Sequence, residues 1–175
     1  MNNPGDNAAG RPSVTTADRN PAAPTVLVSS CLLGLATRYD GTDNFSPEVM
    51  DYLQTSGLIP IPVCPEQLAG LPTPRPKCWF SQGDGDAVLD GTGKLCDENH
   101  QDVTDLFREG AQECLKIARL TGSKIAILQQ RSPSCGSRKI YRNEVLLEGT
   151  GVTAALLKRS GLKIFSDDHL PAEKP

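Results

Sequence analysis

The stretch SKIAILQQRSPSCG at residues 123–136 shows the pattern from which the fold is predicted, a strand followed by a loop with a cysteine. Its first part, SKIAILQQ (123–130), is an apolar run typical of a buried β-strand. Its second part is rich in Ser, Pro and Gly, so we expect a turn there, with Cys135 in a loop just past the end of the strand. A cysteine that serves only packing would lie inside the apolar run. Cys135 instead lies where ligands and catalytic groups are commonly found in sheet proteins.

Two strands earlier in the chain end in the same way. TVLVSSCLLG (25–34) runs into a loop with Cys31, and LIPIPVC (58–64) ends at Cys64. Patterns typical of helices alternate with these strands, at 46–57, 102–122 and 151–161, and a last strand is expected within 162–170. We expect a solvent-facing loop or a short hairpin over residues 81–101, which are rich in Gly and Asp, and a brief strand pair within 139–149. Alternating strands and helices predict a single-domain α/β fold, with a mostly parallel sheet flanked by helices and with long Pro/Gly-rich loops.

The bulk composition excludes several classes of protein. The chain has 175 residues, a net charge of −3 and six cysteines. Neither a strongly basic surface nor an apolar run long enough for a bilayer is expected, and residues 1–24 lack the apolar core of a signal peptide. We therefore predict a cytoplasmic protein with reduced thiols and no membrane partner, present as a monomer or weak homodimer. Residues 1–24 are predicted to form a disordered tail, and residues 25–170 the α/β domain.

Three of the cysteines are predicted to meet in space. Cys31, Cys64 and Cys135 follow different strands, and the carboxyl ends of parallel strands share one edge of a sheet. Three thiolates there suit a soft metal or an iron–sulfur cluster, although ordinary loop thiols, one of them catalytic, remain the alternative. Cys78 is a candidate fourth ligand, whereas Cys114 falls on the apolar stripe of a helix and is expected in the core.

Several long motifs follow one another along the chain: SSCLLG followed by TRYDG, then PVCPEQLAGLPTPRP, RSPSCGSRKIY and GTGVTAALL. They resemble the motifs of the DUF523 family, which includes the thiouracil desulfidases. The resemblance implies a 4Fe–4S cluster held by Cys31, Cys64 and Cys135, with one iron left open. It also implies non-redox removal of sulfur from a thiolated uracil, giving uracil and sulfide. Thiolated RNA nucleosides are an alternative substrate, and a redox-sensing or binding module without desulfidase activity is an alternative function.

The same resemblance suggests catalytic roles for three polar residues. Glu66, two residues after Cys64, would handle protons and help to activate water. Ser132 or Ser134 would assist through a hydroxyl group. The plain alternatives are a surface charge for Glu66 and turn caps for the serines. The GTG stretch (149–151) opens a helix and is either an anion site or an ordinary helix start.

Three further residues are candidates for binding the substrate. Arg38 would hydrogen-bond carbonyl groups or offset cluster charge, and Tyr39 would stack on a ring. A contact between Arg38 and Asp40 that only stabilises the loop is the alternative. Arg75, which a stiff loop between two prolines would aim at the same pocket, is the third candidate.

Overall fold

The computed structural model describes residues 23–172 of the chain. The disordered tail predicted for residues 1–24 therefore lies, up to residue 22, outside the described residues. None of the helices in the described part is long and apolar enough to cross a membrane. The elements in chain order are β1 (Thr25–Ser29), η1 (Ser30–Leu33), α1 (Pro47–Ser56), β2 (Ile59–Val63), α2 (Pro65–Leu68), β3 (Cys78–Gln82), α3 (Gly85–Leu89), β4 (Lys94–Asp97), α4 (Thr104–Thr121), β5 (Ile125–Leu128), β6 (Lys139–Arg142), β7 (Val145–Glu148), α5 (Val152–Arg159) and β8 (Lys163–Ser166).

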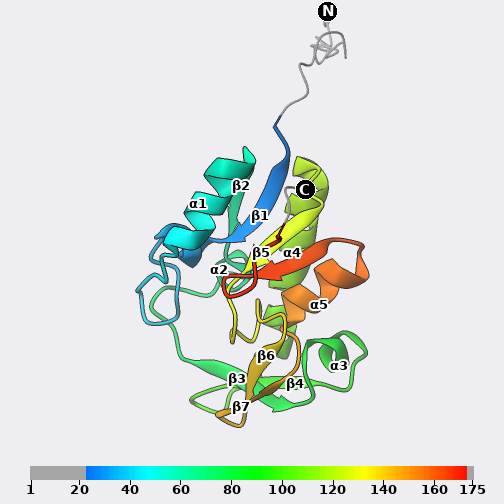
Figure 1. The fold of residues 1–175 in the computed structure, drawn as a ribbon. Helices are drawn as coiled ribbons and strands as arrows, with labels where there is room; N and C mark the ends of the chain where they lie inside the picture. Colours follow the sequence, from blue (N-terminus) through cyan, green and yellow to red (C-terminus); the bar gives the residue numbers. More distant parts are fainter. Residues whose placement is uncertain (1–22, 173–175) are drawn as a thin grey trace, which may run out of the picture.

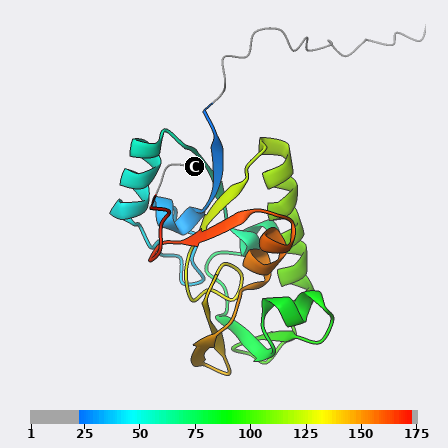
Figure 2. The same cartoon turned by 45° about the vertical axis from the view of Figure 1, so that its right-hand side comes forward.

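The main sheet is parallel, as the sequence predicts, with the strand order β2-β1-β5-β8. Its central strand β5 is buried at every position, which explains the unbroken apolar run IAIL. Helix α1 covers one face, and α4 and α5 cover the other (Figures 1 and 2). Successive residues of β1 point to opposite faces of the sheet: Val26 packs toward α1, while Leu27 packs toward α4.

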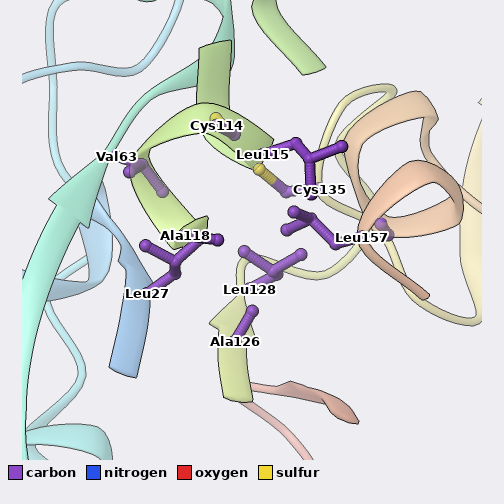
Figure 3. Packing of buried hydrophobic residues seen from close by; sticks show 10 residues of the cluster. Leu27, Val63, Cys114, Leu115, Ala118, Ala126, Leu128, Cys135 and Leu157 are labelled. Carbon is purple, nitrogen blue, oxygen red and sulfur yellow. The ribbon is translucent and has the colours of Figure 1, made fainter. Parts of the chain in front are cut away.

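The core on the α4 side reaches the carboxyl edge of the parallel sheet. Figure 3 shows Cys114 of α4 and Cys135 together with the apolar side chains of this cluster. Cys114 is fully buried, as expected from its place on the helical stripe. Cys135 is 5% exposed, so its thiol lies at the boundary between this core and the sheet edge.

A second, mixed sheet with the order β4-β3-β6-β7 lies beyond that edge (Figure 1). The brief strand pair expected within residues 139–149 is present as β6 and β7, which pair antiparallel. The expectation of a solvent-facing loop or hairpin over residues 81–101 was wrong in part, because this segment forms α3 and β4. Val88 of α3 and Leu95 of β4 are buried against the mixed sheet and α4, and this burial organises an otherwise Gly/Asp-rich segment.

Helix α4 and the short helix α2 touch at a glycine. A side chain at Gly110 of α4 would overlap with the backbone carbonyl of Pro65, the first residue of α2. Only glycine allows this close approach of two backbones. Because Cys64 immediately precedes Pro65, the contact also fixes the position of Cys64 relative to the core.

Replacing Gly110 with alanine is expected to destabilise the protein by about 1–3 kcal/mol, because the added methyl group must displace α2. In an exposed helix the same substitution would stabilise by roughly 0.5–1 kcal/mol, so the expected sign is opposite to helix propensity. Urea unfolding followed by circular dichroism measures the change. Glu109→Ala, at the exposed neighbouring position of α4, is the control and should alter the unfolding midpoint little. An increase in stability for Gly110→Ala would contradict the close approach.

Candidate functional site

A cavity of about 370 Å³ opens at the carboxyl edge of the parallel sheet, and Cys31, Cys64 and Cys135 all line it. Cys31 lies in η1, directly after β1. Cys64 follows β2 and caps α2, and Cys135 lies in the loop after β5. Because β2, β1 and β5 are neighbours in the sheet, their following loops deliver the three thiols to the same place.

The thiols of the cavity lie close enough to influence one another electrostatically. The pKa of Cys31 is raised to about 11, chiefly by burial and also by the neighbouring charge of Cys64, with a smaller opposing effect of Arg38. Burial also raises the pKa of Cys135 well above its ordinary value, and a hydrogen bond with Ser29 opposes this. Charges on Cys31 and Cys64 add to the rise at Cys135. Without a cation among them, these two buried thiols are therefore protonated near neutral pH.

The start of α5 holds the loop that carries Cys135. The backbone N–H of Val152 donates to Pro133 O at 3.0 Å, and that of Thr153 donates to Ser134 O at 2.9 Å. These first N–H groups of the helix are thus occupied by loop carbonyls. The GTG stretch (149–151) is accordingly a helix start that supports the cysteine loop, and the anion-site interpretation was wrong.

Glu66 lies on the cavity wall with both carboxylate oxygens engaged. Oε2 accepts a hydrogen bond from Arg75 Nε at 2.6 Å, and Oε1 accepts one from Ser134 Oγ at 3.1 Å. The side chains of Arg75 and Glu66 are only 3% and 12% exposed. The contact is therefore a buried, charge-assisted pair, and removal of either partner would leave an uncompensated buried charge, which is strongly destabilising.

The two candidate serines have different surroundings. Ser132 lines the cavity, and its Oγ accepts hydrogen bonds from the N–H groups of Ser134 and Cys135, both at 3.1 Å. Ser134 is 1% exposed, and its hydroxyl donates to Glu66. Ser132 therefore caps the turn and still has a hydroxyl proton to donate, whereas the proton of Ser134 is committed to the carboxylate.

Arg38 and Tyr39 line the cavity in the loop that follows η1. Arg38 Nε lies 3.5 Å from Asp40 Oδ1, so the loop-stabilising contact is present. The guanidinium carbon lies 5.8 Å from the centre of the Tyr39 ring. Arg38 Nε is nevertheless buried and makes no hydrogen bond within the described residues. The Arg38 side chain is 31% exposed, so the part of it beyond Nε is open to the cavity that it lines.

Sequence reasoning missed several polar residues of the cavity wall. Gln129 Oε1 accepts a hydrogen bond from Asn44 Nδ2 at 2.6 Å and lies 3.9 Å from Cys31 Sγ. Asp167, after β8, also lines the cavity, and burial raises its pKa. Gln129 directly follows β5 and Asp167 directly follows β8, so the strand-end rule that found the cysteines could have found both. Cys78 lines the same cavity from the start of β3.

Comparison with known proteins places the chain in a family. A family model described as 2-thiouracil desulfurase matches residues 26–169. A protein of Bacillus subtilis (strain 168), the uncharacterized protein YbbK, is 38% identical over 148 residues, which are 83% of this chain and 97% of that protein. The solved structure of TudS, a [4Fe-4S]-dependent thiouracil desulfidase, superposes with a TM-score of 0.72 at 38% identity, covering 85% of this chain and 93% of TudS. This chain belongs to the 2-thiouracil desulfurase family.

Proposed function

We propose that this chain is a desulfidase that converts a thiolated uracil and water into uracil and hydrogen sulfide. The reaction breaks one carbon–sulfur bond and forms one carbon–oxygen bond, with both protons of water passing to sulfur, so no electron donor or acceptor is needed. The observation that carries the proposal is the gathering of three thiols from distant segments on one cavity that also contains a paired carboxylate. Membership of the family and the resemblance to TudS support it.

The residues present fit a 4Fe–4S cluster held by Cys31, Cys64 and Cys135. Within residues 23–172, no three His, Cys, Asp or Glu side chains are grouped closely enough to hold a single metal ion. The three thiols instead surround a shared space, which suits a cluster in which three of the irons each bind one cysteine. Arg38 near Cys31 and Arg75 near Cys64 place positive charge beside the sulfurs, as an anionic cluster with its thiolates requires.

Such a cluster, when bound by only three cysteines, supplies a Lewis-acidic iron with affinity for the sulfur of the substrate. The protein supplies proton transfer. Glu66 lies in the cavity wall, where Arg75 orients it through a hydrogen bond to Oε2, so it takes a proton from the attacking water. Each of its oxygens has a further lone pair available beyond the hydrogen bond that it already accepts.

The two serines have different roles in the proposed reaction. Ser132 faces the cavity and has an uncommitted hydroxyl proton, so we assign it to hydrogen-bond the substrate. Ser134 is buried behind it and orients Glu66 through Oε1. Arg38 and Tyr39 contact the pyrimidine from the opposite loop, through the partly exposed guanidinium group and the ring face respectively.

A metal-free thiol enzyme fits the site less well. Reactive cysteines have a lowered pKa, so that the thiolate is present at neutral pH. The pKa of Cys135, the candidate nucleophile, is instead raised by burial, and that of Cys31 rises to about 11. Both thiols need a bound cation to ionise, which is the state that metal ligation requires.

Replacing Cys31, Cys64 or Cys135 singly with serine is expected to abolish most of the bound iron and the sulfide release, because each cysteine would be the one protein ligand of its iron. Iron content and visible absorption after anaerobic reconstitution measure the first effect. The control is Cys96→Ser in β4, outside the cavity, which should keep both iron and activity. Full iron content in any one of the three variants would remove that residue from the ligand set.

Replacing Glu66 with glutamine is expected to lower kcat by about 100- to 10,000-fold while the cluster still assembles, because the amide keeps the shape of the side chain but cannot accept a proton from water. Sulfide release under anaerobic conditions, divided by iron content, measures the effect. Glu113→Gln on the exposed side of α4, where Glu113 pairs with Lys116, is the matched control and should leave kcat unchanged. An undiminished kcat for Glu66→Gln would assign the proton transfer to another group.

A further inference from the structure

Two arginines line the cavity, and their surroundings are opposite in kind. The Arg75 side chain is 3% exposed, whereas that of Arg38 is 31% exposed. Within residues 23–172, the buried Arg38 Nε makes no hydrogen bond and lies 3.5 Å from Asp40 Oδ1, while the rest of the side chain is partly open. Arg75, in contrast, is surrounded by acceptors on all sides. The two therefore differ in what they can still offer to a bound molecule.

The N–H groups of Arg75 are fully used inside the protein. A guanidinium group has five N–H donors in a fixed planar arrangement. Each has an acceptor here: Glu66 Oε2 at 2.6 Å from Nε, Pro72 O at 3.3 Å and Thr73 Oγ1 at 3.1 Å from Nη1, and Thr37 O at 3.0 Å and Cys64 Sγ at 3.9 Å from Nη2. No donor is left to recognise a substrate carbonyl.

The contacts of Arg75 reach all three segments that carry the cysteines. Thr37 belongs to the loop after Cys31, and Cys64 is contacted directly. The third segment is reached through Glu66, whose other oxygen accepts from Ser134, the neighbour of Cys135. The backbone of Arg75 is held as well, because its N–H donates to Tyr39 O at 2.7 Å.

We propose that Arg75 is a positioning residue, which fixes the carboxylate of Glu66 and the thiol of Cys64 relative to each other and does not bind the substrate. This proposal rests on the proposed function and narrows it. Arg38 is then the arginine that contacts the pyrimidine. A planar fork is required at position 75, because a lysine ammonium group has three donors around a single nitrogen and cannot reach acceptors on opposite sides.

The kinetic test compares Arg75→Lys with Arg38→Lys in reconstituted protein, with rates divided by iron content. For Arg75→Lys we expect kcat to fall by about 10- to 100-fold, the range typical of residues that orient metal ligands, with KM within about twofold of wild type. For Arg38→Lys we expect the reverse, a raised KM with kcat within about twofold. A KM for Arg75→Lys that rises as much as kcat falls, or unchanged kcat and KM, would overturn the proposal.

A second readout uses the metal-free chain and needs no desulfidase activity. Alkylation of each cysteine by N-ethylmaleimide is followed by mass spectrometry in wild type and Arg75→Lys. We expect Cys64 to react at least about threefold faster in the variant, because the shorter side chain uncovers its sulfur, while the fully buried Cys114 keeps its rate. An unchanged rate at Cys64, or a parallel rise at Cys114 that marks general loss of structure, would contradict a positioning role. If wild type released no sulfide, the proposed function would fail while this measurement still tested Arg75.

Discussion

The buried ion pair between Glu66 and Arg75 is the constraint around which the site is arranged. Removing two opposite charges from water is costly, and the cost is offset only when every remaining donor and acceptor is satisfied. Here the guanidinium and the carboxylate are satisfied by groups from different loops, including Thr37 O and the Ser134 hydroxyl. These contacts hold the loops in the relative arrangement that brings the thiols to one cavity.

The same arrangement explains why thiols that resist ionisation are placed together. Cys31 and Cys135 are buried, and burial together with the charges of neighbouring thiols raises their pKa values. Ionisation of these buried thiols is unfavourable unless a cation binds between them, because buried like charges repel one another. Such thiols suit a metal centre whose protein ligands are deprotonated on binding, which agrees with the similarity of the chain to TudS, a [4Fe-4S]-dependent protein.

Much of the fold could be predicted because it depends on local patterns. The run IAIL of β5 and its Ser/Pro/Gly ending identify a buried parallel strand, and the strand-end rule then locates the three cysteines. The segment that forms α3 and β4 could not be predicted, because Val88 and Leu95 are isolated apolar residues in a Gly/Asp-rich stretch, and only their burial against distant elements makes α3 and β4 form. The different roles of Ser132 and Ser134 also depend on tertiary contacts and could not be predicted. The same holds for Arg75, because its partners include backbone carbonyl groups, which leave no signal in the sequence.

The central claim is that the three thiols together hold one cluster that performs the chemistry. It is tested most directly by measuring iron, uracil and sulfide in a single anaerobically reconstituted sample given 2-thiouracil or 4-thiouracil. The account predicts about one 4Fe–4S cluster per chain, with uracil and sulfide formed in equal amounts and without an added reductant or oxidant. A chain that retains no iron, or one that retains the cluster and releases no sulfide, would contradict it.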